Sequence, residues 1–224
     1  MAYEEYEGGY KVTGIGTCKD TDVVIPNSYN GKPVVAIGAE AFMDSSMVSV
    51  TIPSNVVEIE IDAFNSCLAL ETINMAEGLK TIGEYAFVAC SSLKKVVIPN
   101  SVVNIKDGAF ASCSSLKTAT FGSNISYIGF EVFSETSLED VYYKGSFGQI
   151  SKSTIEREYN DNLFNATWHC NDMQAEGIGF SGDCVWTKKG TQLIIAGSGD
   201  GRMEDYDDNR DCPWDSVEYD QVII

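Results

Sequence analysis

The sequence has few basic residues and almost no histidine. Its 15 Lys and Arg residues face 33 Asp and Glu residues, which leaves a formal net charge of −18. Binding to nucleic acids or to anionic membranes requires clustered Lys and Arg, so neither is an expected partner. Any histidine-based hydrolysis would have to use His169, the single histidine. No apolar run approaches the roughly 18 residues of a membrane-spanning helix.

The first residues also lack the basic and apolar regions of a signal peptide. We therefore expect the chain to be a segment of a longer protein, whose export signal lies elsewhere. The seven cysteines are odd in number, too sparse for a disulfide scaffold, and have no C-x-x-C spacing typical of zinc sites. A disulfide among Cys170, Cys184 and Cys212 stays open.

The strongest feature that is present is an internal repeat. An Ala-Phe pair, degenerate in its last copy, recurs every 22 or 23 residues, an Ile lies five residues before each Phe, and three of the copies carry an in-register Cys. The Phe positions are Phe42, Phe64, Phe87, Phe110 and Phe133; the Ile positions are Ile37, Ile59, Ile82, Ile105 and Ile128; the thiols are Cys67, Cys90 and Cys113. A fixed period of this length predicts a solenoid whose units touch only their neighbours.

Each repeat contains a short alternating run, such as Leu93-x-x-Val96-x-Ile98, which predicts a strand. One repeat cannot bury enough apolar surface to fold alone, so neighbouring repeats must stack around a shared column of Phe, Ile and Leu. The in-register thiols are predicted to be buried and to pack like small hydrophobic groups. The expected fold is a β-rich α/β solenoid of about five coils.

The pattern I-P-x-x-V-x-x-I-x-x-x-A-F-x-x-C-x-x-L, from Ile98 to Leu116, resembles the BspA-like subfamily of leucine-rich repeats. It lacks the Asn ladder of the commoner leucine-rich repeats. Residues 9–42 are similar to the opening unit of such arrays, and residues 141–169 are similar to their closing segment. The resemblance implies a right-handed superhelix that belongs to a bacterial surface or secreted protein. We expect no catalytic activity and no cofactor.

The expected domain organisation has three parts. Residues 1–145 form the array, residues 146–172 cap its end, and residues 173–224 begin a second, truncated module. Two β-prone runs around a Lys-Gly turn predict a β-hairpin over residues 184–197 of that module.

Three other motifs suggest chemistry only weakly. The acidic loop 205–211 begins like an EF-hand loop, but its sixth position is Arg210 rather than Gly and its twelfth is Ser216 rather than Glu. A solvated acidic turn therefore competes with calcium binding there, and no metal site is assigned. The Gly-rich stretch 197–201 lacks the Lys of a phosphate-binding loop, which favours a turn. His169 is interpreted as a partly buried histidine of the cap rather than as half of a Cys-His catalytic pair.

The surface that could bind a partner is the outward side of the repeat strands, where short hydroxyl-bearing side chains predominate. The candidate residues are Ser49, Thr51, Thr72, Asn74, Lys95, Val97, Thr118, Thr120, Asp140 and Tyr142. We expect them to bind a protein or glycan on a host or neighbouring cell, since solenoids commonly use such a face. Two alternatives stay open: the chain is a structural spacer, or Ser and Thr are present only because they suit solvated strand positions.

Overall fold

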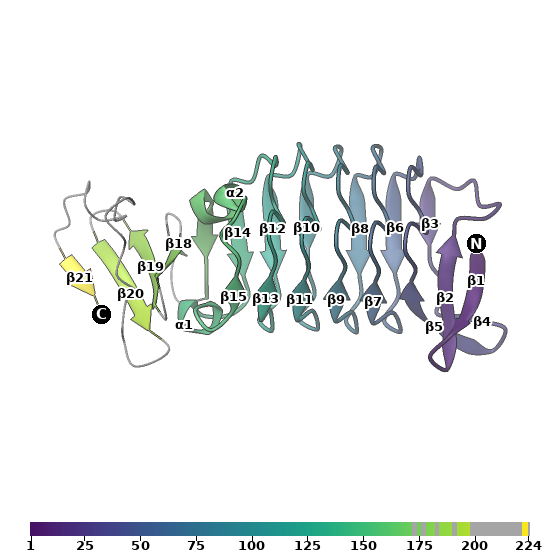
Figure 1. Ribbon diagram of the computed structural model, residues 1–224, viewed down its shortest axis with the longest axis horizontal. Coiled ribbons are helices and arrows are strands. Elements are labelled where there is room, and N and C mark those ends of the chain that lie inside the picture. Colours follow the sequence, from purple (N-terminus) through teal and green to yellow (C-terminus); the bar gives the residue numbers. More distant parts are fainter. Residues whose placement is uncertain (172–173, 176–177, 182–183, 190–191, 198–220, 224) are drawn as a thin grey trace.

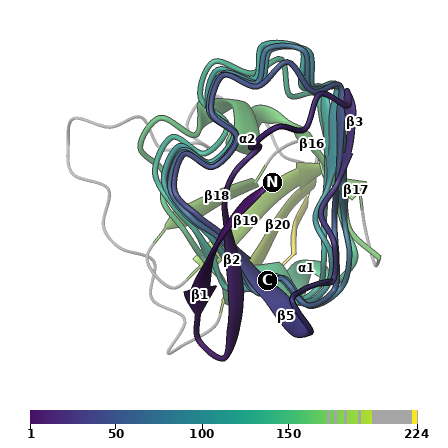
Figure 2. The ribbon, with the colours of Figure 1, turned by 90° about the vertical axis from the view of Figure 1, so that its right-hand side faces the viewer.

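The computed structural model describes residues 1–171 throughout and, beyond them, the backbone of the strands that lie between residues 174 and 223. The chain forms an elongated stack of coils (Figure 1), and a view along the stack shows successive coils lying over one another (Figure 2). The described helices are two short ones, α1 (Phe147–Ile150) and α2 (Asp161–Asn165). Neither has the length or hydropathy to cross a membrane. The predicted β-rich solenoid is confirmed.

One wall of the solenoid is a long sheet to which each coil adds a short parallel strand. Its parallel strands, in order, are β2 (Gly9–Gly14), β5 (Lys32–Ile37), β7 (Glu58–Ile59), β9 (Thr81–Ile82), β11 (Asn104–Ile105), β13 (Tyr127–Ile128) and β15 (Thr154–Ile155). Two antiparallel strands complete the sheet at its N-terminal end: β1 (Ala2–Tyr6) pairs with β2, and β4 (Ser28–Tyr29) pairs with β5. We call this sheet the long wall.

The number of coils is larger than the sequence predicts. Five strands of the long wall, β5 to β13, carry the repeated Ile and correspond to the five expected coils. β2 precedes them and β15 follows them in the same sheet, which gives seven parallel strands. The prediction of about five coils was therefore too low. It counted only copies of the Ala-Phe marker, whereas the opening and closing segments join the sheet through backbone hydrogen bonds without that marker.

The opposite side of the same coils forms a second wall of short strands. Its first three strands are β3 (Asp22–Val24), β6 (Ser49–Ile52) and β8 (Thr72–Met75). The next five are β10 (Lys95–Val97), β12 (Thr118–Phe121), β14 (Asp140–Tyr143), β16 (Thr167–His169) and β17 (Gln174–Ala175). The neighbours pair in parallel, except that β16 and β17 are antiparallel and that β8 and β10 are not paired. We call these strands the second wall.

A separate four-stranded sheet follows the array. It contains β18 (Ile178–Ser181), β19 (Cys184–Lys189), β20 (Gln192–Gly197) and β21 (Gln221–Ile223). The antiparallel pairing of β19 with β20 is the hairpin that the sequence predicts over residues 184–197. The division of the chain into an array, a cap and a second module remains our proposal.

A column of stacked phenylalanine rings runs through the core. Neighbouring rings from Phe42 to Phe133 lie 5.0, 4.9, 5.3 and 5.7 Å apart between centroids, and the planes of each pair differ by at most 10°. Phe121 and Trp168 continue the aromatic contacts beyond Phe133, each at 5.8 Å. Every ring of the column is almost fully buried. The periodic Phe therefore fills the same place in each coil, as the repeat predicts.

The three in-register thiols are buried, as the repeat predicts. The thiols of Cys67, Cys90 and Cys113 each donate a hydrogen bond to the carbonyl oxygen of a Phe in the preceding coil, at 3.1 to 3.4 Å. Contact with the Cys113 and Cys67 thiols, together with burial, raises the pKa of the Cys90 thiol. A neutral, buried thiol is a poor nucleophile and a poor metal ligand, so Cys90 serves packing.

The turns place two residues of each coil in the left-handed region of backbone space. These residues lie two positions before and two positions after the repeated Phe. The first set is Glu40, Asp62, Tyr85, Gly108 and Glu131, and the second is Asp44, Ser66, Ala89, Ser112 and Glu135, all with φ between 47° and 61°. Nine of these ten are not glycine, so residue type alone does not predict these bends.

Asn160 connects the closing segment to the last Ala-Phe-type coil. Its side-chain Nδ2 donates to the carbonyl oxygens of Gly129 and Glu156, both at 2.7 Å, and its Oδ1 accepts from the backbone N–H of Phe133 at 3.3 Å. The residue is fully buried. Trp168, also buried, donates from Nε1 to the Leu163 carbonyl at 3.0 Å. These contacts cover the end of the Phe column with satisfied polar groups.

Candidate binding face

The strands of the second wall direct alternate side chains into the core and into solvent, because successive residues of a strand face opposite sides. The inward residues are apolar and buried, as Val50, Ile73 and Val96 are. The ten predicted outward residues are all half-buried or exposed. Strand register aligns Ser49 with Thr72 and Thr51 with Asn74 on β6 and β8, and it aligns Lys95, Thr118 and Asp140, and Val97, Thr120 and Tyr142, on β10, β12 and β14. The repeat period places these two sets in two continuous rows. We call these ten residues the outward face.

Both rows extend one strand further at each end than the sequence indicates. On β3, Asp22 and Val24 lie beside Ser49 and Thr51, and the Ser49 hydroxyl donates to Asp22 Oδ1 at 2.6 Å. On β16, Thr167 and His169 pair in register with Asp140 and Tyr142. β3 precedes the first Ala-Phe pair, and α2 lengthens the step from β14 to β16 beyond the repeat period. The register of the marker therefore could not locate either strand.

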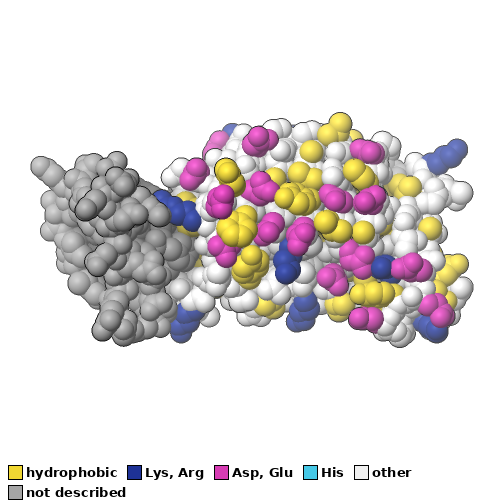
Figure 3. Space-filling model, viewed as in Figure 1, with side chains coloured by type: hydrophobic (Ala, Val, Ile, Leu, Met, Phe, Trp, Pro, Cys, Tyr) yellow, Lys and Arg dark blue, Asp and Glu magenta, His cyan; other side chains and the backbone are white. Residues whose placement is uncertain are grey.

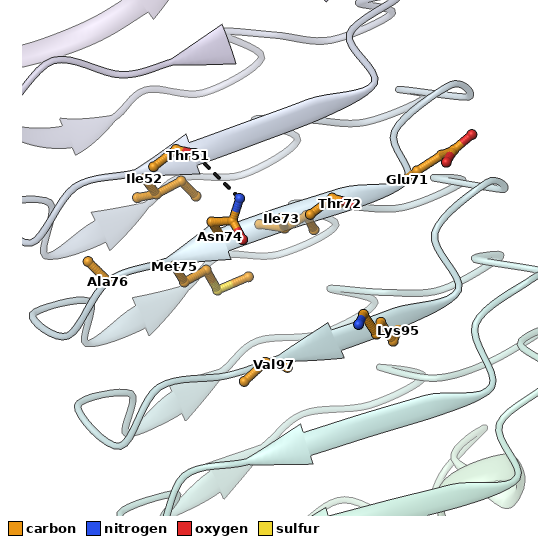
Figure 4. Close-up of a pocket in the computed structure, with 10 residues that line it drawn as sticks. All are labelled: Thr51, Ile52, Glu71, Thr72, Ile73, Asn74, Met75, Ala76, Lys95 and Val97. Carbon is orange, nitrogen blue, oxygen red and sulfur yellow. Dashed lines mark hydrogen bonds between the residues drawn. The ribbon is translucent and has the colours of Figure 1, made fainter. Parts of the chain in front are cut away.

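A hollow interrupts the outward face at its centre. The hydrogen-bonded order of the second wall breaks between β8 and β10, whereas β7, β9 and β11 of the long wall remain paired through the same coils. The hollow has a volume of about 550 Å³, and Figure 4 shows the residues around it. Its lining consists of Thr51, Ile52, Glu71, Thr72, Ile73, Asn74, Met75, Ala76, Lys95 and Val97. Six of the lining side chains are polar or lie on the outward face.

The turn after β8 departs from the repeat. Ala76 stands where Pro53 and Pro99 stand in the adjacent coils. Glu77 then accepts the backbone N–H groups of Asn100 at 3.1 Å and Ser101 at 2.8 Å. Burial, the largest single influence, raises the pKa of the Glu77 carboxyl, but the hydrogen bonds from the backbone and side chains of Asn100 and Ser101 together lower it below its ordinary value. Thus a charged side chain fixes this turn to the next one.

The C-terminal end of the outward face carries an aromatic pair. The rings of Tyr142 and His169 are stacked, with centroids 4.4 Å apart and planes 9° apart. The His169 Nε2 lies 2.7 Å from Asp140 Oδ1, and because an ionised carboxylate only accepts, the ring N–H donates to it. Tyr142 remains 43% exposed. His169 is partly buried, as predicted, but it belongs to the outward rows rather than only to the cap.

The other chemical motifs gain no support from the described residues. No group of three or more His, Cys, Asp or Glu residues within them is arranged to hold a metal ion. His169 contacts a carboxylate and a tyrosine ring, which is not the arrangement of a Cys-His nucleophile. The acidic loop 205–211, the Gly-rich stretch 197–201, and the side chains of Cys184 and Cys212 lie outside the described residues, so the calcium and disulfide questions stay open there.

Comparison with known proteins identifies the repeat. The family described as a BspA-type leucine-rich repeat region matches residues 35–161 in six copies. A search of curated proteins found no match.

Solved structures share the architecture. A leucine-rich repeat protein of T. pallidum aligns with a TM-score of 0.60 and 28% identity, over 69% of this chain and 77% of that protein. A leucine-rich cell surface protein of Faecalibacterium prausnitzii aligns with a TM-score of 0.58 and 21% identity, over 86% of this chain. The match spans 58% of the F. prausnitzii chain, and it establishes similarity of fold.

Proposed function

Because the chain belongs to the BspA-type leucine-rich repeat family, we propose that it is a non-catalytic binding module of a bacterial surface or secreted protein. Members of this family are repeat proteins, and the family indicates a surface or protein-interaction module. In our proposal the outward face adheres to a protein or glycan on a host or neighbouring cell. The cell-surface description of the F. prausnitzii relative supports the proposed location.

The observation that carries this proposal is the alignment of ten solvent-accessible side chains in two rows across five strands. The backbone of these strands is held by the neighbouring coils and the inward side chains are held by the core. The outward groups are therefore fixed in position before a partner arrives, which lowers the ordering cost of binding. Hydroxyl, amide and charged groups at regular spacing can make several hydrogen bonds to one partner.

A second function, that of a structural spacer, is supported by the continuous Phe column. Five stacked rings and seven parallel strands of the long wall give an uninterrupted core along the array. Such a body would hold other domains at a fixed distance. A spacer does not require any outward side chain to be of a particular type.

The test is binding of the full chain to an array of extracellular-matrix proteins and glycans, beside two variants. The face variant carries Thr72→Glu, Lys95→Glu and Thr118→Glu. The control variant carries Thr81→Glu and Thr154→Glu on the long wall and Lys106→Glu directly after β11, which make the same change in charge away from the outward face. Thermal denaturation checks that both variants fold.

We expect a specific signal that the face variant loses and the control variant keeps. Equal loss in both variants would show that added negative charge, rather than the outward face, controls binding. Absence of any signal with the unmodified chain would favour the spacer.

A further inference from the structure

The stacked pair on β14 and β16 leaves one aromatic surface open on the outward face. Tyr142 and His169 occupy paired positions on adjacent strands and their rings are nearly parallel. The ring planes are therefore roughly perpendicular to the line that runs from one strand to the next across the sheet. His169 covers one side of the Tyr142 ring, and the other side is directed toward Thr120 on β12, its partner in register.

The residues beside this ring are short and mostly polar. Thr118 and Thr120 project outward from β12, and their side chains are too short to cover the tyrosine, which stays 43% exposed. Val97, 46% exposed, continues the row on β10. The Tyr142 ring thus projects from the surface at one end of a row of shorter side chains, and that row extends to the hollow between β8 and β10. Two steps of about 4.8 Å between strands separate β10 from β14.

The stacked pair is rigid. The Asp140 carboxylate accepts the N–H of His169, and His169 in turn stacks on Tyr142, so both rings are held before a ligand binds. Only Oδ1 of Asp140 takes part in this hydrogen bond. Its second oxygen and the hydroxyls of Thr118 and Thr120 are placed to hydrogen-bond a ligand that packs against the ring. Prior fixing of the aromatic side chain reduces the entropy that binding costs.

The charge of the outward face favours a neutral ligand over a basic or an acidic one. The outward face holds one Lys and one Asp among its ten residues, so its formal charge is zero on a chain of −18. The side of the molecule in Figure 3 shows many acidic side chains among apolar ones, with few basic ones. A basic partner would find stronger attraction on such a surface than on the outward face. An acidic partner would meet both the net negative charge and, beside the ring, Asp140.

Resting on the proposed function, we propose that the outward face binds a neutral oligosaccharide, with one sugar ring packed on the free side of Tyr142. The C–H groups on one face of a pyranose ring are apolar and pack on an aromatic ring. Its hydroxyl groups meet the Thr118 and Thr120 hydroxyls and the Asp140 carboxylate. The buried centre of a protein interface is usually more apolar than its rim. On the outward face the exposed apolar groups are single residues.

The test is binding of the full chain to immobilised neutral oligosaccharides (gluco-, manno- and galacto-hexasaccharides), heparin, polygalacturonate and extracellular-matrix proteins. Four variants are compared with the unmodified chain: Tyr142→Ala, Tyr142→Phe, Asp140→Asn, and Tyr159→Ala as the control. Tyr159 is an exposed tyrosine, 64% accessible, away from the outward face.

We expect binding to at least one neutral hexasaccharide, weakened about tenfold or more by Tyr142→Ala because the ring contact is lost. Tyr142→Phe keeps the ring and should stay within about threefold, and Tyr159→Ala should have no effect. Asp140→Asn should reduce discrimination against the anionic polysaccharides. Thermal denaturation monitors folding, and Tyr142→Phe keeps the test decisive if Tyr142→Ala is unstable, because a ring-dependent site tolerates it.

Two results would overturn the inference. The first is neutral-sugar binding that Tyr142→Ala leaves unchanged. The second is a chain that binds only proteins or anionic polysaccharides. If protein binding is then lost in the variant Thr72→Glu, Lys95→Glu, Thr118→Glu, the proposed adhesion function stands and only the ligand class is wrong. Absence of binding to every probe would overturn both.

Discussion

The inward and outward residues of the second wall lie on the same strands, yet residue type varies much less from coil to coil at the inward positions than at the outward ones. Inward positions are apolar in each of the five strands from β6 to β14, and the Phe, Ile and Cys columns behind them keep one residue type for several coils. Outward positions change from Ser to Thr, Lys and Asp along one row. Stacking thus fixes the inward residue type, whereas the outward residues are free to serve recognition.

The largest loss of stability is expected when a ring of the buried Phe column is removed. We predict that Phe87→Ala lowers the free energy of unfolding by about 3–5 kcal/mol, because the ring stacks on Phe64 and Phe110 and leaves a cavity. Lys94→Ala, an exposed residue of the same coil, should cost less than about 1 kcal/mol. Urea unfolding measures both. Comparable midpoints for the two variants would contradict the stacked column.

A second effect, of intermediate size, concerns the end of the array. Asn160→Ala removes three hydrogen bonds made by a fully buried side chain and leaves backbone groups without partners. The expected loss is about 1–3 kcal/mol. Asn165→Ala, at an exposed position in α2, should change stability by less than about 0.5 kcal/mol. If urea midpoints show equal losses for both, Asn160 does not hold the closing segment to the last coil.

The smallest expected effect is a pH dependence at the turn after β8. Folding lowers the pKa of Glu77, so its contribution to stability is present above the unfolded-state pKa and is lost as pH falls through the folded-state pKa. Glu77→Gln should therefore lower the melting temperature slightly at pH 7. The difference from the unmodified chain should shrink as the pH falls below the ordinary pKa of Glu, about 4.3. A difference that does not shrink as the pH falls would show that the carboxylate charge is not the cause.

The sequence predicts the inward columns and the alignment of the outward face well. Phe87 or Val96 can be assigned to the core because period and alternation determine which way a side chain points once coils stack. The same register aligned Ser49 with Thr72 and Lys95 with Thr118, on either side of the break between β8 and β10.

Other features depend on contacts that no period records. The coil count was too low because β2 and β15 join the long wall through backbone hydrogen bonds. The sequence did not place His169 in the outward rows because α2 lies between β14 and β16 and lengthens that coil. The break between β8 and β10, and the hollow beside it, concern pairing between backbones, to which the outward side chains give no clue.

The central claim, that each strand of the second wall is divided between the core and a free face, can be tested on one strand. The measurement is the urea unfolding midpoint of Thr118→Glu, Ala119→Glu and Thr120→Glu, three neighbouring positions of β12. Ala119 is fully buried, and its neighbours face outward. We predict near-normal midpoints for the two outward variants and loss of folding for Ala119→Glu, since an unpaired carboxylate would be buried. Equal midpoints for all three would contradict the account.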